Sequence, residues 1–186
     1  GDDDLVRVKL NVDTSQYFED AASVLAPNSE HIILLANPVL PHSEGEIVLQ
    51  SADPNTHPVI RLNYYDDPHD MQVMKAVIRK ALSIAAHWPG NDKLGAALIP
   101  PFLVRKHGYV SGSDPSDELL EEMALYFTLT VYHETSTCRI GDVVDAQLRV
   151  MGVNNLRVAD ASVMPNVISG NTNAPSIMIG EKGADM

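Results

Sequence analysis

The sequence predicts an α+β fold, because strand-like segments come first and two amphipathic helical segments follow. Residues 5–12 alternate apolar and polar side chains with the period of two that is typical of a half-buried strand. Residues 74–85 instead place apolar side chains three and four positions apart, which is the spacing of one helix face. We therefore expect strands in the first part of the chain and helices after them.

Further strands are expected before the helices. Residues 31–36 form a short apolar run that indicates a more buried strand. Residues 46–50 and 59–63 also have strand character, and a segment rich in Asp, Asn, Ser and Pro separates them. We expect these last two strands to pair as antiparallel neighbours.

The first helix has clear start and stop signals. Pro68 is favoured in a first helical turn, and Asp70 complements the positive end of the helix dipole. Residues 88–90, Trp-Pro-Gly, should end it. Its buried stripe should consist of Met74, Val77, Ile78, Ala81, Leu82 and Ala85.

A second helix is expected after Asp114-Pro115, which repeats the start signal of the first. The residues between the two helices, 93–112, are predicted to be an irregular connection. The apolar face of this second helix should consist of Leu119, Leu120, Met123 and Phe127.

Composition restricts the partners of this chain. Its 25 acidic and 13 basic residues give a net charge of −12, which repels both a nucleic-acid backbone and an anionic lipid surface. No apolar run approaches the ~20 residues of a membrane span, and the start does not resemble a signal peptide. A single cysteine, Cys138, excludes an internal disulfide and gives no sign of an oxidising compartment, so a cytoplasmic location is expected.

The last third of the chain carries a succession of motifs. Tyr132-His133 is followed by Thr137-Cys138-Arg139, and Asp160-Ala161-Ser162 lies within residues 156–165, Leu-Arg-Val-Ala-Asp-Ala-Ser-Val-Met-Pro. Residues 171–175 then read Asn-Thr-Asn-Ala-Pro. This succession closely resembles the C-terminal signature of the glucose-methanol-choline (GMC) flavin oxidoreductases, and residues 45–70 resemble the start of the same region.

The resemblance implies a fold and a domain organisation. Residues 1–128 would form a substrate-binding domain, a mainly antiparallel sheet with helices on one face. Residues 129–186 would be a catalytic strand–helix segment that returns to complete the FAD-binding domain. No Gly-x-Gly-x-x-Gly motif follows a strand in the chain. The N-terminal FAD-binding part of the same protein is therefore an expected partner, and without it FAD should bind weakly or not at all.

His133 is the candidate catalytic base. A neutral imidazole accepts a hydroxyl proton near neutral pH, but any one of seven histidines taken alone is more often an ordinary surface or hydrogen-bonded residue. The segment around His133 is similar to the family's His-x-x-Gly-Thr-Cys-Arg-Met-Gly, in which the histidine faces the flavin. The resemblance therefore assigns the base to His133.

Asn171 is the candidate partner of that base. A carboxamide donates a hydrogen bond to an oxygen that becomes negative as its proton leaves, although an Asn in Ser-Gly-Asn-Thr-Asn is also an ordinary turn residue. The family has His or Asn at this place, and the register of the end of the chain puts Asn171 there. Asn173 is the near rival.

The resemblance also implies cofactor contacts by Asp160, Ala161, Asn173, Ala174 and Pro175. Pro175 opens an apolar stretch that predicts a buried helix beginning just after Asn173, and the positive end of such a helix would stabilise a reduced flavin. Residues 156–160 are expected to form the strand that leads to the flavin, or an ordinary core strand.

Two departures from the family pattern stand close to His133. Ser136 occupies a position where the family usually has glycine, and its Cβ would resist a glycine backbone geometry. The interval after Gly141 is shorter than usual, which indicates either a deletion or a loop missing from the sequence. Cys138 could be a nucleophile or a buried thiol, and the second is favoured. His133 and Glu134 lack the spacing of a zinc helix, so no metal is expected.

The hypothesis from sequence is thus the C-terminal part of an FAD-dependent GMC oxidoreductase, a dehydrogenase or oxidase that converts a small-molecule alcohol to an aldehyde or ketone. Non-redox or photochemical chemistry on the same scaffold, as in a lyase or a decarboxylase, is the first alternative. A catalytically inactive binding module is the second.

Overall fold

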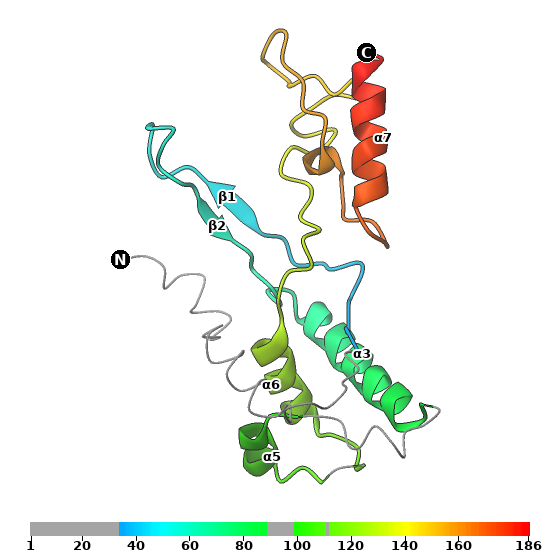
Figure 1. Cartoon of the computed structure of the whole chain (residues 1–186). Coiled ribbons are helices and arrows are strands. Elements are labelled where there is room, and N and C mark those ends of the chain that lie inside the picture. Colours follow the sequence, from blue (N-terminus) through cyan, green and yellow to red (C-terminus); the bar gives the residue numbers. More distant parts are fainter. Residues whose placement is uncertain (1–33, 89–98, 111) are drawn as a thin grey trace, which may run out of the picture. The chain divides into compact units, whose positions relative to one another are not determined.

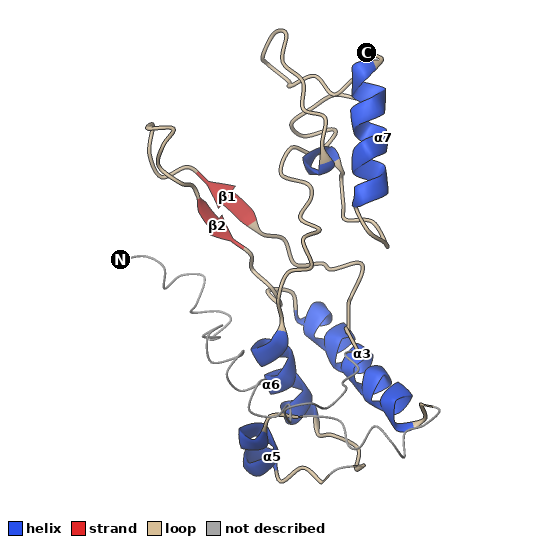
Figure 2. Cartoon of the chain, viewed as in Figure 1, coloured by secondary structure: helices blue, strands red, loops and turns tan. Residues whose placement is uncertain are grey.

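A computed structural model of the chain describes residues 34–88, 99–110 and 112–186, and all statements below concern these residues (Figure 1). Helices make up most of the regular structure, and the strands form one short pair (Figure 2). Among the described helices, none combines the length and apolar character that a membrane span requires. In chain order the elements are β1 (Glu46–Val48), β2 (Val59–Arg61), α3 (Pro68–Ala86), α5 (Pro101–His107), α6 (Asp117–Phe127), the 3-10 turn η1 (Ala161–Val163) and α7 (Asn173–Ala184).

The described residues divide into two compact units. The first contains residues 34–45 and 60–128, and the second contains residues 46–59 and 129–186. Helices α3, α5 and α6 belong to the first unit, whereas η1 and α7 belong to the second. The functions expected for residues 1–128 and 129–186 stay predictions.

Strands β1 and β2 form the small antiparallel sheet that the sequence predicts, although each strand is two residues shorter than expected. The turn between them is closed by Asp53, whose carboxylate accepts hydrogen bonds from the backbone and side-chain nitrogens of Asn55, both at 3.0 Å. Gly45 lies just before β1, and a Cβ there would meet the carbonyl oxygen of Arg61 at 2.4 Å. Glycine at this position therefore permits the close approach of the two chain segments.

Helix α3 begins where the sequence predicts, with Pro68 as its first residue. Asp67 is the N-cap, and its Oδ1 accepts a hydrogen bond from the His69 amide at 2.8 Å. The helix ends at Ala86, and its C-cap His87 directly precedes the Trp-Pro-Gly sequence. The predicted stripe is half-buried at every position, Met74, Val77, Ile78, Ala81, Leu82 and Ala85.

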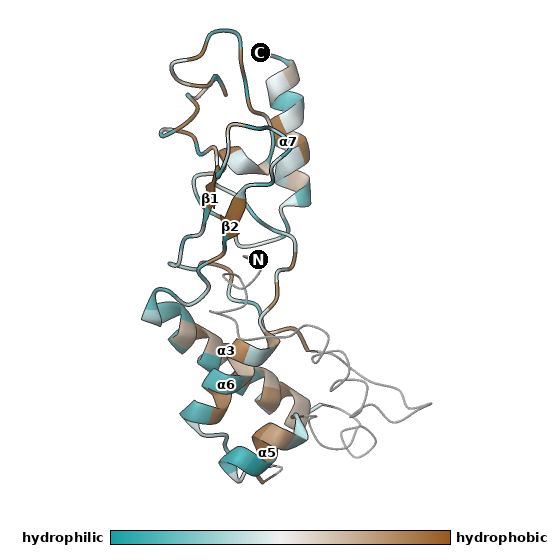
Figure 3. Cartoon of the chain, turned by 90° about the vertical axis from the view of Figure 1, so that its left-hand side faces the viewer, coloured by the Kyte–Doolittle hydropathy of each residue, from teal (hydrophilic) through white to brown (hydrophobic). Residues whose placement is uncertain are grey.

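A small aliphatic core joins α5 and α6. Leu103 of α5 and Leu119 of α6 are both 1% exposed, and they pack together with Ile99. Leu120 of α6 is fully buried. Figure 3 shows polar and apolar residues alternating along α6, as expected of an amphipathic helix. The predicted apolar face of α6 is therefore confirmed at Leu119 and Leu120.

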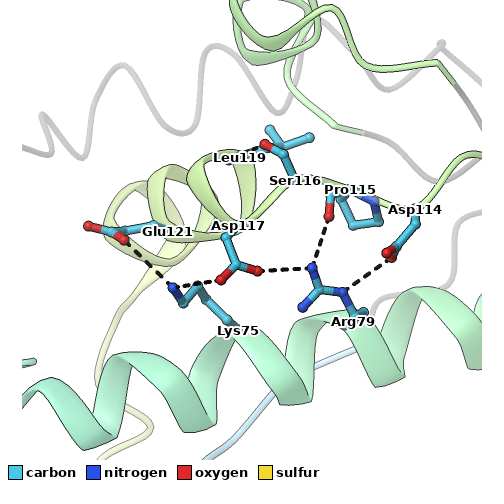
Figure 4. A network of polar contacts seen from close by, with 8 residues as sticks. All are labelled: Lys75, Arg79, Asp114, Pro115, Ser116, Asp117, Leu119 and Glu121. Atoms are coloured by element: carbon cyan, nitrogen blue, oxygen red, sulfur yellow. Dashed lines mark hydrogen bonds and ion pairs between the residues drawn. The ribbon is translucent and has the colours of Figure 1, made fainter.

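Polar contacts connect α3 to the start of α6 (Figure 4). The guanidinium of Arg79 donates to Asp117 at 3.0 Å and to Asp114 at 3.2 Å, and Lys75 donates to Asp117 at 3.3 Å. The hydrogen bond from Arg79 is the main reason that the pKa of Asp117 lies below its ordinary value. Because the carboxylates are exposed to solvent, each pair contributes little stability.

The fold differs from expectation in two places. The segment 93–112, predicted to be irregular, contains α5. Its first residue is Pro101, and proline is well suited to that position because the amide that it lacks would have no hydrogen-bond partner in a first helical turn. Residues 34–36 are not a strand, and no described segment pairs with them. The expected strand 5–12 and residues 31–33 lie outside the described residues, within which β1 and β2 are the only strands, so the mainly antiparallel sheet stays a prediction.

The side chain of Asp70 anchors the chain before β1 to the first turn of α3. Its two carboxylate oxygens accept the backbone amides of His42 and Ser43 at 2.8 and 2.7 Å, and the residue is only 5% exposed. Burial by itself raises the pKa of this carboxyl, but the amide hydrogen bonds outweigh burial, so the pKa lies below its ordinary value. The ionised form is therefore the one that the fold stabilises.

We expect Asp70→Asn to destabilise the protein by about 2 kcal/mol at neutral pH, because an amide nitrogen would face one of the two backbone donors. A carboxyl group whose pKa is lowered by folding stabilises the folded protein above its pKa in the unfolded chain, which is about 3.9. This contribution is lost as the pH falls through the pKa of the folded protein. The difference between wild type and variant should therefore shrink below about pH 4. Unfolding midpoints of the complete protein across pH would measure it.

The matched control is Asp185→Asn, because Asp185 is exposed at the end of α7. It should change stability by less than about 0.5 kcal/mol at any pH. Equal effects of the two substitutions would contradict the anchoring role of Asp70.

Candidate functional site

The second unit is organised by a buried aliphatic cluster. Val144 and Val163 are fully buried and Leu148 is 5% exposed, and Ile179 of α7 packs against them. Above this core the amides of Cys138 and Ile140 donate to the carbonyls of Ser162 and Val163, both at 2.9 Å. The motif around Cys138 and the motif that contains η1 are therefore adjacent in space.

Helix α7 lies against the same core. A Cβ at Gly183 would meet the Cβ of Ala159 at 3.0 Å, so glycine allows the helix to approach the segment before η1. The helix begins at Asn173. It is not buried within the chain as predicted, since Ile177 and Met178 are 59% and 58% exposed. Within this chain α7 contributes Ile179 to the cluster.

The structure brings His133 and Asn171 together. The Nε2 atom of His133 lies 2.9 Å from Oδ1 of Asn171, although the two residues are 38 positions apart. His133 is half-buried and Asn171 is exposed. Asn173, the rival for this role, lies in the first turn of α7, and Asn171 is the asparagine that contacts the imidazole. The two candidate catalytic side chains thus occupy one site.

Thr172 is a third member of the site that sequence reasoning missed. Its Oγ1 lies 3.0 Å from Nδ1 of His133, and the residue is 7% exposed. A threonine between two asparagines has no distinguishing sequence signal, because only the path of the chain before α7 directs it toward the imidazole. Both ring nitrogens of His133 therefore have a hydrogen-bond partner from consecutive residues.

The segment that carries His133 is shaped by left-handed backbone conformations. Tyr132 and Ser136 have φ values of 63° and 75°. The amide of Tyr132 donates to Oγ1 of Thr130 at 3.0 Å, and the same hydroxyl contacts Glu134. Ser136 therefore adopts the glycine-type backbone despite its Cβ, which costs about 1 kcal/mol for a residue with a side chain.

The residues expected to contact the cofactor fall into two groups. Asp160 caps η1 through hydrogen bonds from Ser162, with Ala161 half-buried beside it. The first turn of α7 consists of Asn173, Ala174 and Pro175. The first backbone hydrogen bond of the helix is donated by the amide of Ser176 to the carbonyl of Thr172. The amides of Asn173 and Ala174 precede that bond, so this helix end suits an electron-rich group.

Other expectations for this region have mixed outcomes. Residues 156–160 do not form the predicted strand; Arg157 makes a single bridge to Arg149. The interval after Gly141 closes as a turn, with the Gly141 amide donating to the Val144 carbonyl at 2.8 Å. Cys138 is half-buried. The described part of the chain holds no group of three or more His, Cys, Asp or Glu side chains placed to bind a metal.

Comparison with known proteins identifies the family. A family model described as GMC oxidoreductase matches residues 41–180. The chain therefore belongs to the GMC oxidoreductase family, as the motifs predict. A GMC-type oxidoreductase of Mycobacterium bovis is 43% identical over 171 residues, which are 87% of this chain and 30% of that protein.

Other relatives extend the comparison. An alcohol dehydrogenase (acceptor) of Pseudomonas putida and an oxygen-dependent choline dehydrogenase of Escherichia coli are each 39% identical, over 80% and 77% of this chain. The chain spans only 26% and 25% of their lengths. It thus corresponds to less than a third of each of these proteins.

Solved structures agree with this relationship. Formate oxidase of Aspergillus oryzae, in a structure concerned with FAD modification, is 31% identical with a TM-score of 0.65 over 78% of this chain and 25% of that chain. An FAD-dependent oxidoreductase of Chaetomium thermophilum is 27% identical with a TM-score of 0.68 over 79% of this chain and 25% of that chain. FAD, the cofactor expected from sequence, is thus the cofactor of the related proteins.

We expect Ser136→Gly to stabilise the protein by about 0.5–1 kcal/mol, because glycine adopts a positive φ without steric cost. Ser136→Ala is the control, since it also removes the hydroxyl but keeps the Cβ. Unfolding midpoints of the complete protein would measure both variants. A glycine variant no more stable than the alanine variant would contradict the backbone explanation.

Proposed function

We propose that this chain is the C-terminal substrate-binding and catalytic part of an FAD-dependent GMC oxidoreductase that oxidises an alcohol to an aldehyde or ketone. The observation that carries the proposal is the 2.9 Å contact between His133 and Asn171, the two residues that the family motifs assign to the reaction. The alcohol dehydrogenase and choline dehydrogenase named among the relatives support an alcohol as substrate.

His133 is the base in this proposal. Oxidation of an alcohol removes the hydroxyl proton and a hydride from the carbon, so that a carbonyl forms. FAD, when bound, supplies the acceptor for the hydride. The proton passes to Nε2 of His133, the ring nitrogen beside the exposed Asn171. The half-buried ring is accessible on this side.

Asn171 holds the substrate oxygen. Its Oδ1 can only accept, so the contact with Nε2 is a hydrogen bond in the state in which Nε2 carries a proton. The Nδ2 group of the same carboxamide is left to donate to the oxygen of the alcohol. Such a bond strengthens as the oxygen gains negative charge, and it therefore lowers the barrier to proton removal. When the ring is protonated, Oδ1 accepts the new Nε2 proton.

Two groups of residues would hold the cofactor. The amides of Asn173 and Ala174 at the start of α7, with Pro175 fixing the first turn, would stabilise negative charge on a reduced flavin. Asp160 and Ala161 at η1 would supply further contacts. The remainder of the FAD site would come from an N-terminal FAD-binding part of the same protein, since the chain spans 30% or less of the relatives described above.

We expect His133→Ala to slow flavin reduction by an alcohol by about 10²–10⁴-fold in the complete protein, because the general base is lost. Flavin content should stay near that of wild type. Anaerobic stopped-flow measurement of flavin reduction tests this directly. Near-normal reduction by the variant would refute the assignment of the base, and failure of alcohols to reduce the wild-type flavin would favour the non-redox alternative.

The matched control is His57→Ala. His57 is an exposed histidine in the turn between β1 and β2, where its backbone carbonyl, not its ring, accepts a hydrogen bond from Gln50. This variant should reduce its flavin at the wild-type rate. A comparable loss in both variants would point to a general effect of histidine removal.

A further inference from the structure

The segment that carries His133 is not fixed by backbone hydrogen bonds. Residues 129–135 belong to no helix or strand, and within the described part of the chain neither their amides nor their carbonyls bond to another backbone group. A segment of this kind depends on side chains for its conformation. The position of the candidate base therefore depends on which side chains bond to the backbone beside it.

A single hydroxyl joins the residues on either side of His133. Oγ1 of Thr130 accepts a hydrogen bond from the amide of Tyr132 at 3.0 Å and donates its own proton to the carboxylate of Glu134. The directions of both bonds follow from the groups, because an amide nitrogen can only donate and an ionised carboxylate can only accept. We call these two bonds the Thr130 clamp.

Tyr132 requires such support because its backbone is left-handed. Its φ of 63° is uncommon for a residue with a side chain, and for a bulky residue it is an outlier. Tyr132 is 84% exposed, so packing within the described chain does not impose this conformation. Strained backbone persists only where surrounding contacts hold it. The contact that holds Tyr132 is the bond from its amide to Thr130.

We propose that Thr130 is a positioning residue, which keeps the imidazole of His133 beside Asn171 by fixing the backbone before and after the histidine. The inference rests on the proposed function, in which His133 is the base. The ring of His133 is held by its contacts with Asn171 and Thr172, and the clamp holds its backbone. If Tyr132 relaxed to an ordinary negative φ, the chain would enter His133 in another direction and displace the ring.

Substitution of Thr130 tests the clamp in the complete protein. Thr130→Val keeps the branched shape but removes both bonds, and it should slow anaerobic flavin reduction at saturating alcohol about tenfold, since a 1 Å displacement of a catalytic group costs up to about 10²-fold. The alcohol concentration that gives half the maximal rate should change less than about twofold, because the loss concerns the base and not substrate binding. Thr130→Ser keeps the hydroxyl and should restore the rate.

Ser113→Ala provides a matched control. It also removes a hydroxyl from a local turn, where Ser113 donates to the carbonyl of Val110 at 2.7 Å, but this turn belongs to the first unit. The rate of flavin reduction should be unchanged. If Ser113→Ala slows it as much as Thr130→Val, or if Thr130→Ser does not restore it, the positioning role is wrong.

A double substitution tests whether Thr130 acts through Glu134. Glu134→Ala removes one end of the clamp and should also slow flavin reduction. Because Thr130→Val already breaks both bonds, the variant with both substitutions should be no more than about twofold slower than Thr130→Val alone. Losses that multiply as for independent sites would overturn the clamp.

Hydrogen exchange tests the clamp without any measurement of alcohol oxidation. In the wild-type complete protein the amide of Tyr132 should exchange at least about tenfold more slowly than an unprotected amide, and Thr130→Val should remove this protection. An unprotected Tyr132 amide in the wild type would overturn the inference even if Thr130→Val failed to fold. Failure of the proposed function is separate, because it would appear as normal flavin reduction by His133→Ala while the Tyr132 amide stays protected.

Discussion

The candidate site depends on one constraint, the buried aliphatic cluster of the second unit. Val144, Leu148 and Val163 are removed from solvent together, and Ile179 attaches α7 to them. Burial of each such side chain contributes about 1.5–3 kcal/mol. The residues of the site themselves bury little apolar surface, so His133 and Asn171 meet because this core holds the segments that carry them.

Hydrogen bonds refine what the core brings together. The amides of Cys138 and Ile140 fix the segment after His133 against η1, and the left-handed conformations at Tyr132 and Ser136 turn it toward the start of α7. Ser136 has a positive φ although its Cβ makes that conformation sterically unfavourable. The structure around Ser136 therefore holds the turn in this conformation. Asn171 and Thr172 then contact the two nitrogens of the imidazole.

The first unit is stabilised by different means. A small aliphatic core between α5 and α6 is supplemented by the ionised, buried Asp70 and by the exposed ion pairs between α3 and α6. The exposed ion pairs add little stability, whereas the hydrogen-bonded carboxylate of Asp70 stabilises the start of α3. Each unit thus has a hydrophobic core of its own.

The sequence by itself determined the family, the start of α3, the presence of α6, the β1–β2 pair and the contact candidates His133 and Asn171. These features depend on local signals: a proline at a helix start, apolar periodicity and short motifs. Tertiary structure alone decided that Thr172 contacts His133, that Ser136 is left-handed and that Ile177 and Met178 remain exposed within this chain. The physical reason is that such properties depend on which distant segments pack together, and a helix or turn signal does not encode its neighbours.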